Sequence, residues 1–220
     1  FAGLQGAGRT AFAKALYGDE PFQSGNITIR GVGVVLKQPR DAVKHGICML
    51  PGDRKTEALL LMQSVRDNGM VSARAFSGIL GSNAVSKFGT VADNDGLLDQ
   101  LDVRAANYEQ EIRSLSGGNQ QKTVVARWLA LKPSVLIFVE PTRGIDVNAK
   151  VGIYQLMREL ARGGAVVMMV SSDLPEVLGV SDRIIVMREG AIVGEFPRHT
   201  NEAEIMHAAT GEHDVVGAAR

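Results

Sequence analysis

Residues 115–122 read LSGGNQQK, and this stretch does more than any other to decide the fold. Ser116 stands directly before Gly117 and Gly118, and an amphipathic segment follows at residues 123–131. A serine at this point favours a helix N-cap, and the two glycines leave the first N–H groups of the helix uncovered. On its own, the motif predicts a capped helix and nothing more. Together with a phosphate loop elsewhere in the chain, it predicts a second place where an anion can bind.

Beyond this motif, short apolar runs alternate with helical patterns. The apolar runs are five or six residues long and rich in β-branched side chains, as in buried parallel strands. Strand, helix and strand at this spacing form a βαβ unit, and a further unit follows it. The expected strands lie at residues 134–139, 165–170 and 183–187, and the expected helices at 148–162 and 174–178. The sequence therefore predicts an α/β fold with a mainly parallel sheet over residues 116–190.

The chain before the motif is organised differently. Residues 25–36 alternate and turn like a small antiparallel β ribbon. Residues 58–114 have weak strand signals, scattered glycine and serine, and a helical stretch at 91–101, which predicts a mostly helical lobe inserted into the core. The tail, residues 201–220, is expected to form one helix to about Ala209 and then to fray.

Near the N-terminus, residues 3–10 read GLQGAGRT and match the phosphate-loop pattern G-x-x-x-x-G-K-[ST], except that Arg9 replaces the lysine. Glycines in such a loop let backbone N–H groups point at phosphate oxygens, and the threonine hydroxyl binds Mg²⁺. Residues 11–17 supply the helix that must follow. The strand that precedes such loops is not in the sequence, where only Phe1 and Ala2 stand before Gly3. Because glycine-rich turns also arise for packing reasons, the loop alone leaves both interpretations open.

Composition narrows the function classes without naming one. The 24 basic and 24 acidic residues give a formal net charge of zero, which indicates neither a nucleic-acid surface nor an acidic tail. Cys48 is the single cysteine, so an intrachain disulfide and a cysteine-based metal site are excluded. No apolar run approaches the roughly 18 residues that a bilayer-spanning helix needs. The 25 glycines indicate positions with unusual backbone conformations.

The order of the motifs points to a family. Residues 140–146 (EPTRGID) follow the first apolar strand, and residues 170–176 (VSSDLPE) end the next. With the phosphate loop and LSGGNQQ before them, they resemble the nucleotide-binding domain of ABC transporters. More narrowly, GAGRT, DRK at 53–55 and VSSDLPEVLGVSDRIIVMREG look like the second, C-terminal half of the tandem ATP-binding subunit of bacterial monosaccharide importers of the ribose, galactose, xylose and arabinose type. The resemblance covers nearly the whole chain and is weakest in residues 58–110. It implies a P-loop NTPase core of the ABC ATPase type.

The resemblance implies roles for the matching residues of the phosphate loop. Five of them would contact the phosphates of ATP, and the threonine among them would also bind Mg²⁺: Gly3, Gly6, Gly8, Arg9 and Thr10. Glu140 matches the carboxylate that orients the attacking water. Its place at the carboxyl end of a buried strand favours this role over that of a solvated residue.

Two further motifs match groups that serve an opposing domain. Ser116, Gly117 and Gly118 match the signature that contacts the γ-phosphate of a nucleotide held by that domain, and Asp146 matches the loop that couples the two sites. Such domains pair head to tail, so that each site combines one phosphate loop with the other domain's signature. The expected partner is therefore a second nucleotide-binding domain, the N-terminal half of the same subunit.

Four positions depart from the family pattern, and all of them weaken hydrolysis at the chain's own site. Arg9 keeps the positive charge of the missing lysine, but a planar guanidinium cannot reproduce a compact ammonium. Val139 stands where the family has an aspartate that holds Mg²⁺, and Ser172 replaces the histidine that senses the γ-phosphate. Gly52, or the adjacent Asp53, stands at the position of the family's glutamine. We expect nucleotide to be held weakly at this loop and hydrolysed very slowly there.

The implied function is the ATP-binding domain of a sugar importer, which couples ATP binding and hydrolysis to carbohydrate uptake. Its helical lobe would dock on a membrane permease at the cytoplasmic side of the bacterial inner membrane, and a sugar-binding protein would act indirectly. A non-hydrolysing regulatory or dimer-scaffolding module of the same fold remains the alternative. ATPases of DNA repair and chromosome organisation share the signature, but they need long heptad coiled coils, which the sequence lacks.

Three local motifs receive structural interpretations. Residues 53–55 are expected to form a solvated turn near the lobe, with contact between Arg54 and the partner domain as the second possibility. Ser171 and Ser172 are expected to cap the helix that begins near Asp173. Trp128 and the pair Met168 and Met169 lie in apolar patterns and are expected in the core.

Overall fold

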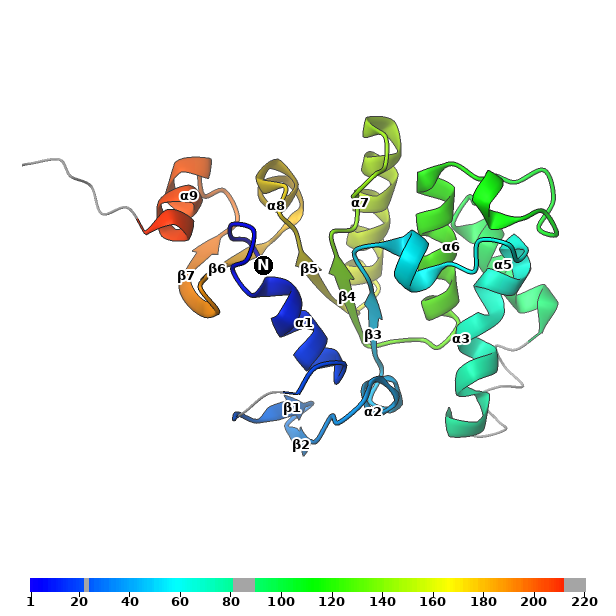
Figure 1. Ribbon diagram of the computed structural model, residues 1–220, viewed down its shortest axis with the longest axis horizontal. Coiled ribbons are helices and arrows are strands. Elements are labelled where there is room, and N and C mark those ends of the chain that lie inside the picture. Colours follow the sequence, from blue (N-terminus) through cyan, green and yellow to red (C-terminus); the bar gives the residue numbers. More distant parts are fainter. Residues whose placement is uncertain (22–23, 81–89, 212–220) are drawn as a thin grey trace, which may run out of the picture.

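A three-stranded parallel sheet forms the centre of the molecule. The computed structural model describes residues 1–21, 24–80 and 90–211. The sheet has the order β3 (Ile47–Leu50), β4 (Val135–Val139) and β5 (Val166–Val170), with Leu136 of β4 opposite Cys48 and Val167. In Figure 1 its strands lie between α1 (Arg9–Tyr17) on one side and α6 (Gly117–Leu129) on the other. The predicted parallel α/β core is confirmed.

The central strand β4 divides the interior into two cores, because successive side chains of a strand point to opposite faces. Leu136 and Phe138 pack into one core with residues of α6 and α7 (Val147–Arg162). Ile137 and Val139 pack into the other core with residues of α1 and α2 (Pro39–Lys44). Sites at the carboxyl end of this strand are therefore supported by helices from both faces.

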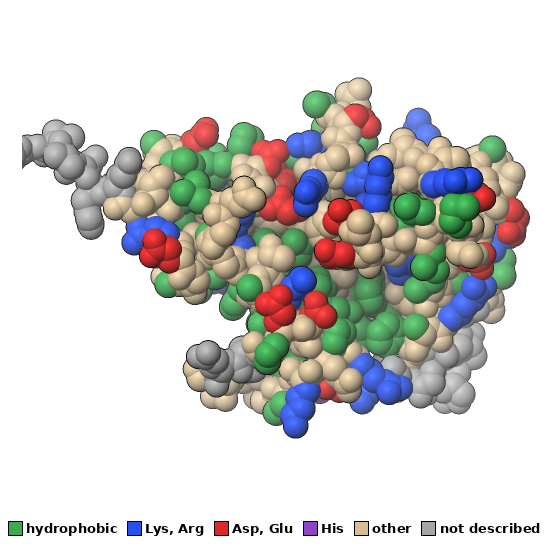
Figure 2. Space-filling view, in the orientation of Figure 1, with side chains coloured by type: hydrophobic (Ala, Val, Ile, Leu, Met, Phe, Trp, Pro, Cys, Tyr) green, Lys and Arg blue, Asp and Glu red, His purple; other side chains and the backbone are tan. Residues whose placement is uncertain are grey.

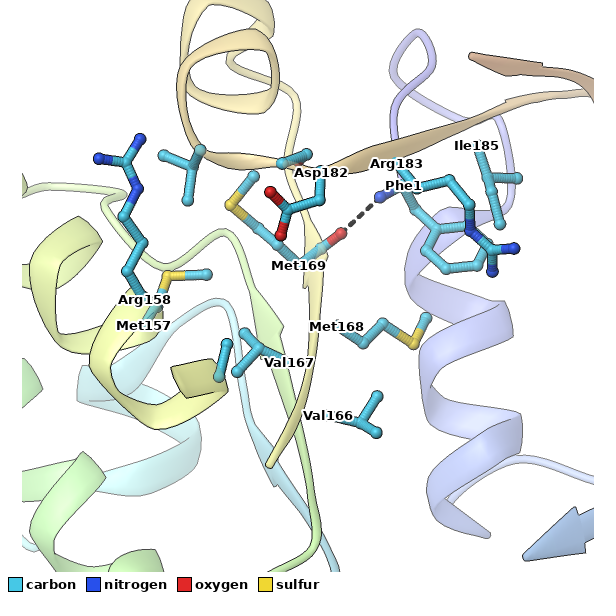
Figure 3. A pocket seen from close by; sticks show the side chains of 13 residues that line it. Phe1, Met157, Arg158, Val166, Val167, Met168, Met169, Asp182, Arg183 and Ile185 are labelled. Atoms are coloured by element: carbon cyan, nitrogen blue, oxygen red, sulfur yellow. Dashed lines mark hydrogen bonds between the residues drawn. The ribbon is translucent and has the colours of Figure 1, made fainter. Parts of the chain in front are cut away.

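The strand predicted after β5 is confirmed as β6 (Arg183–Arg188), and its Val186 forms a parallel bridge with Ala2. β6 also pairs antiparallel with β7 (Ala191–Pro197) in a sheet of two strands, and β7 was not predicted. Phe1 and Ala2 lie between the two sheets: the Phe1 amino group donates to the Met169 carbonyl oxygen, and the Ala2 N–H donates to the Ile185 carbonyl oxygen. Beside this junction is an apolar hollow of about 460 Å³ (Figure 3). The phosphate loop therefore starts from backbone that is fixed on both sides.

The helices between β3 and β4 lie at one end of the molecule in Figure 1. They are α3 (Val65–Leu80), α5 (Val91–Gln100) and α6, with a π-helical turn (Arg54–Ala58) and a 3₁₀ turn (Ile112–Ser114). The antiparallel ribbon is confirmed as β1 (Ile27–Ile29) and β2 (Val32–Val34). The last helices are α8 (Leu174–Val180) and α9 (Glu202–Thr210); the predicted fraying of the tail beyond residue 211 lies outside the described residues.

Three residues that the sequence placed in the core lie in the apolar interior. Met169 is buried, Met168 is half-buried, and Trp128 packs its ring against Tyr17 and Phe76, which confirms their predicted place in the apolar interior. In the part of the chain that the structure describes, no helix is both long and apolar enough to span a bilayer. Figure 2 shows acidic and basic side chains interspersed over one face, as the neutral net charge led us to expect.

Candidate functional site

The phosphate loop is held in place by the β6–β7 hairpin. A Cβ on Gly3 would lie 2.3 Å from the Met187 carbonyl oxygen, so only glycine fits there. The Gly190 N–H donates to the Ala7 carbonyl oxygen at 3.1 Å. Gly8, with φ of 90°, is the N-cap residue of α1, and no side chain caps this helix. The start of α1, which has no acidic residue in its first turn, therefore presents uncapped N–H groups that suit an anion.

Arg9 turns into the protein. Its side chain is buried, and its Nη1 donates to the Ser171 carbonyl oxygen. Burial lowers the pKa of Arg9, and the negative charge of Glu140 partly offsets this effect. The guanidinium thus fastens the phosphate loop to the loop after β5. Contact between Arg9 and a phosphate, which the sequence led us to expect, stays a prediction.

A small hollow at the carboxyl end of β4 brings several predicted site residues together. Its volume is about 160 Å³, and its lining includes Thr10, Gly52, Asp53, Val139 and Glu140. Glu140 has φ of 45°, a conformation that non-glycine residues seldom adopt, and such strain often marks functional positions. Its Oε2 accepts the N–H of Ser172 at 3.2 Å and the Ser172 hydroxyl at 3.0 Å. Ser172 therefore fixes the orientation of the one carboxylate expected to act on water.

The lining of this hollow includes three carboxylates, and a metal ion would need their oxygens to converge. The loop N–H groups and the exposed Thr10 hydroxyl suit phosphate oxygens. Val139, however, is only 3 % exposed and is packed among apolar side chains, so it offers no oxygen where Mg²⁺ would need one. Among the described residues, no group of three His, Cys, Asp or Glu side chains is placed to hold a metal ion. The residues present therefore do not form a complete Mg²⁺ site.

The signature residues lie at the start of α6, away from this hollow. The prediction that Ser116 caps the helix through its side chain is wrong: the Ser116 hydroxyl accepts no helix N–H, and instead accepts from Asn119 Nδ2 at 3.1 Å. A Cβ on Gly117 would lie 2.6 Å from Arg54 Nη2, and one on Gly118 would lie 2.7 Å from the Ala149 Cβ. The two glycines thus allow close packing, which the sequence did not indicate.

Arg54 corrects another prediction. Residues 53–55 were expected to form a solvated turn, but Arg54 is buried and donates to the carbonyl oxygens of Arg143 and Gly144, at 2.6 and 2.9 Å. The predicted loop residue Asp146 follows directly, and its Oδ1 caps α7 by accepting the Ala149 N–H at 2.9 Å. The loop from Glu140 to Asp146 is therefore held at both ends. The sequence signal for Arg54 was its place in a short charged motif before the lobe.

The loop after β5 also differs from the prediction. Asp173, and not the serine pair, caps α8 by accepting the Glu176 N–H. The Ser171 hydroxyl accepts the Asp173 N–H and donates to Glu176 Oε2. Glu176 is almost completely buried, and burial raises its pKa more than its hydrogen bonds with Ser171 and Thr142 lower it. Sequence reasoning missed Glu176, because an acidic residue in the first turn of a helix ordinarily faces solvent.

Comparison with known proteins agrees with this geometry. The ABC transporter family model matches residues 1–143. The chain is 46% identical to the ribose import ATP-binding protein RbsA of Lactococcus lactis subsp. lactis, over 96% of this chain and 43% of that protein. It is also 46% identical to the arabinose import ATP-binding protein AraG of Vibrio parahaemolyticus, over 90% of this chain and 39% of that protein. The chain thus spans less than half the length of these relatives.

Solved structures show the same fold. An ATP-binding cassette of an ABC transporter in its ADP conformation superimposes with a TM-score of 0.75 at 20% identity, covering 95% of this chain and 82% of that chain. A nucleotide-free cassette superimposes with a TM-score of 0.76 at 18% identity, covering 98% and 84%. With the phosphate loop, the LSGGNQQ helix and the Glu140 strand end in their places on this fold, the chain belongs to the ABC transporter family.

Proposed function

We propose that this chain is the ATP-binding domain of a bacterial sugar importer, and that it supplies a working signature to a partner domain while its own site is degenerate. The relatives named for ribose and arabinose import support the class of cargo. One observation supports the asymmetry most strongly: Val139 is an apolar core residue in the hollow that holds Thr10 and Glu140, whereas the signature helix keeps its serine and both glycines.

At its own site, the chain binds nucleotide through backbone. The N–H groups at the start of α1 and the Thr10 hydroxyl hold phosphate oxygens, while Ser172 holds the Glu140 carboxylate. Phosphoryl transfer depends on charge positioned around the γ-phosphate, and each missing electrostatic group costs about 100-fold to 1000-fold in rate. With Val139 in the metal position and Arg9 turned toward Ser171, this site binds but turns over very slowly.

The second nucleotide-binding domain is the main partner. Ser116, Gly117 and Gly118 close over the nucleotide in that domain, and Asp146 lies beside the contact between the two sites. The helical lobe at residues 58–114 docks on a membrane permease from the cytoplasmic side, and a sugar-binding protein delivers the cargo. The two-domain arrangement agrees with the greater length of the relatives.

The test is ATP hydrolysis by the full-length protein that contains this chain. Ser116→Arg places a long cation where the γ-phosphate of the partner's nucleotide must lie, and we expect turnover to fall by about 100-fold or more. Glu140→Gln removes only the carboxylate of the slow site and should change turnover less than about twofold. Ser24→Arg, at an exposed position near the β ribbon, is the matched control. Unchanged turnover in Ser116→Arg would refute the proposed division of labour.

Nucleotide affinity separates this function from the alternative, a scaffold of the same fold. The isolated chain should bind ATP with an affinity that Mg²⁺ barely changes, and should hydrolyse it barely above background. A scaffold would show no ATP binding in the same titration. Robust Mg²⁺-dependent hydrolysis by the isolated chain would contradict the degenerate site.

A further inference from the structure

Arg54 joins two segments that are far apart in the sequence. It begins the π-helical turn (Arg54–Ala58) after β3. Its Nη1 and Nη2 donate to the carbonyl oxygens of Arg143 and Gly144, and its Nε donates to Gln120 Oε1 at 3.3 Å. Gln120 belongs to the first turns of α6, and its amide in turn donates to the Ile112 and Leu115 carbonyl oxygens. One guanidinium therefore holds both the signature helix and the loop before Asp146.

Arg54 is held by hydrogen bonds to neutral acceptors and not by an ion pair. Arg54 is 8 % exposed, and desolvation by burial lowers its pKa. The neighbouring Asp53 carboxylate accepts the N–H groups of Lys55 and Thr56 instead, and no ion pair of the described residues includes Arg54. A buried cation that is satisfied by neutral acceptors contributes little net stability, but its planar fork fixes the relative positions of the acceptors.

Gly117 provides a second, independent observation. A Cβ at this position would meet Arg54 Nη2 at 2.6 Å and the Gly144 carbonyl oxygen at 2.9 Å. The first residue of the signature helix thus lies directly against the hydrogen bond between Arg54 and Gly144. The signature glycine and the arginine are complementary parts of one contact.

We propose that Arg54 is a positioning residue that sets the spacing between the signature (Ser116 to Gly118) and the loop from Arg143 to Asp146. Among the described residues, its hydrogen bonds go to Gln120, Arg143 and Gly144, and not to the phosphate loop or Thr10. It acts on the two segments that the proposed function assigns to the partner's nucleotide, and in this sense the inference rests on the proposed function.

The same turn is tied to α6 at its other end. Arg127 is buried and donates to the Ala58 carbonyl oxygen and, at 2.7 Å, to the Asn68 carbonyl oxygen. Gln120 and Arg127 are seven residues apart, two helical turns, and so lie on one face of α6. The turn between the sheet and the lobe is therefore bound to the signature helix at both ends.

Hydrogen exchange in the full-length protein tests the positioning directly. In Arg54→Gln, which cannot reach all three acceptors, backbone amides of residues 142–149 and 115–120 should exchange faster. Those of the β6–β7 hairpin should be unchanged. Arg54→Lys should behave like Arg54→Gln, because an ammonium cannot reproduce the fork. Arg127→Gln removes a second buried arginine from the same helix and should affect residues 58–68 instead.

Kinetics supply the second measurement. Arg54→Gln should lower kcat for ATP by about 10-fold to 100-fold, as misplacement of a catalytic segment does, while KM changes less than about twofold. Gly117→Ala should also impair turnover, and adding Arg54→Gln to it should cost less than the product of the two single effects, because one clashing group is gone.

The outcomes distinguish failure of the positioning role of Arg54 from failure of the proposed function. Unchanged exchange at residues 142–149 and 115–120 in Arg54→Gln overturns the positioning role, even if Ser116→Arg abolishes turnover. Unchanged turnover in Ser116→Arg overturns the proposed function, while the exchange result still decides the contact. A uniform increase in exchange across the protein would show that Arg54 merely stabilises the fold, and would also overturn the proposal.

Discussion

The phosphate-loop region and the signature region are built in opposite ways. The phosphate loop has a tightly packed backbone, with Gly3 against the Met187 carbonyl and Gly8 starting α1, while the buried Val139 and Arg9 stand where the proposed function places its departures. The signature region contains the LSGGNQQ motif, and Arg54 supports it by hydrogen bonds to Gln120 and to the Gly144 carbonyl oxygen. The first region is shaped by glycine packing and a buried apolar side chain, and the second by hydrogen bonds from a buried arginine. The comparison teaches that the two halves of the proposed function rest on different kinds of contact.

The largest expected effect tests whether the shape of the phosphate loop is as tightly constrained as that of the signature. Gly3→Ala places a Cβ 2.3 Å from the Met187 carbonyl oxygen at φ of 150°, and should lower the free energy of unfolding by about 2–4 kcal/mol. Gly6→Ala is the control, since its Cβ would meet nothing within 4 Å; it should cost about 1 kcal/mol. Denaturant unfolding measures both. Equal losses would mean that the loop is not held against the hairpin.

A smaller effect tests whether a carboxylate at position 139 allows Mg²⁺ to bind with the nucleotide. Val139→Asp puts a carboxylate into the hollow that holds Thr10, and should make nucleotide binding about 10-fold tighter with Mg²⁺ than without it. The buried charge should lower the free energy of unfolding by about 2 kcal/mol. Val139→Asn, of the same shape but without charge, is the control for titration calorimetry. The same Mg²⁺ dependence in both variants would show that position 139 does not limit metal binding.

The smallest effect concerns Glu176, a buried residue of α8 whose Oε2 accepts a hydrogen bond from Ser171 in the loop that also holds Arg9. Burial raises its pKa in the folded state, so the unfolded chain ionises first as pH rises. The free energy of unfolding should therefore fall as pH rises from the ordinary glutamate value through the raised one. Glu176→Gln should remove this fall and gain stability relative to the native chain at neutral pH.

Denaturant midpoints from about pH 4 to about pH 8 measure this difference. Glu159→Gln, on the exposed side of α7, is the matched control and should follow the native profile. Parallel profiles for Glu176→Gln and the native chain would show that this carboxylate does not link stability to pH.

Sequence reasoning predicted the elements with strong local patterns. The apolar runs at β4 and β5, the helical stripe of α7 and the ribbon β1–β2 are all where they were expected. It missed β3 although Gly46 and Pro51 flank it, because Ile47–Leu50 has four residues and only one of them is β-branched. It predicted β6 but not its antiparallel partner β7, because residues 191–197 contain no long apolar run.

The candidate site could be predicted to the level of motifs. Thr10, Val139 and Glu140 lie around one hollow, as their order on strand ends implied. The roles of Arg54 and Glu176 could not be read from the sequence, because both are ionisable residues that the fold buries. Their burial depends on tertiary packing. Arg54, for example, donates to the carbonyl oxygen of Gly144, which is 90 positions away and cannot be identified from sequence periodicity.

Arg54 and Arg127 bond α6 to the turn at Arg54–Ala58 at two points, so helix and turn are expected to move together. Its 13 residues, at about 1.5 Å each, span about 20 Å. A tilt of about 10° about its Arg127 end would carry Ser116 about 3 Å sideways, several times the latitude of a hydrogen bond. Because the turn at Arg54–Ala58 is bonded to α6 at Gln120 and at Arg127, a displacement of this turn would carry the whole helix, and Ser116 with it.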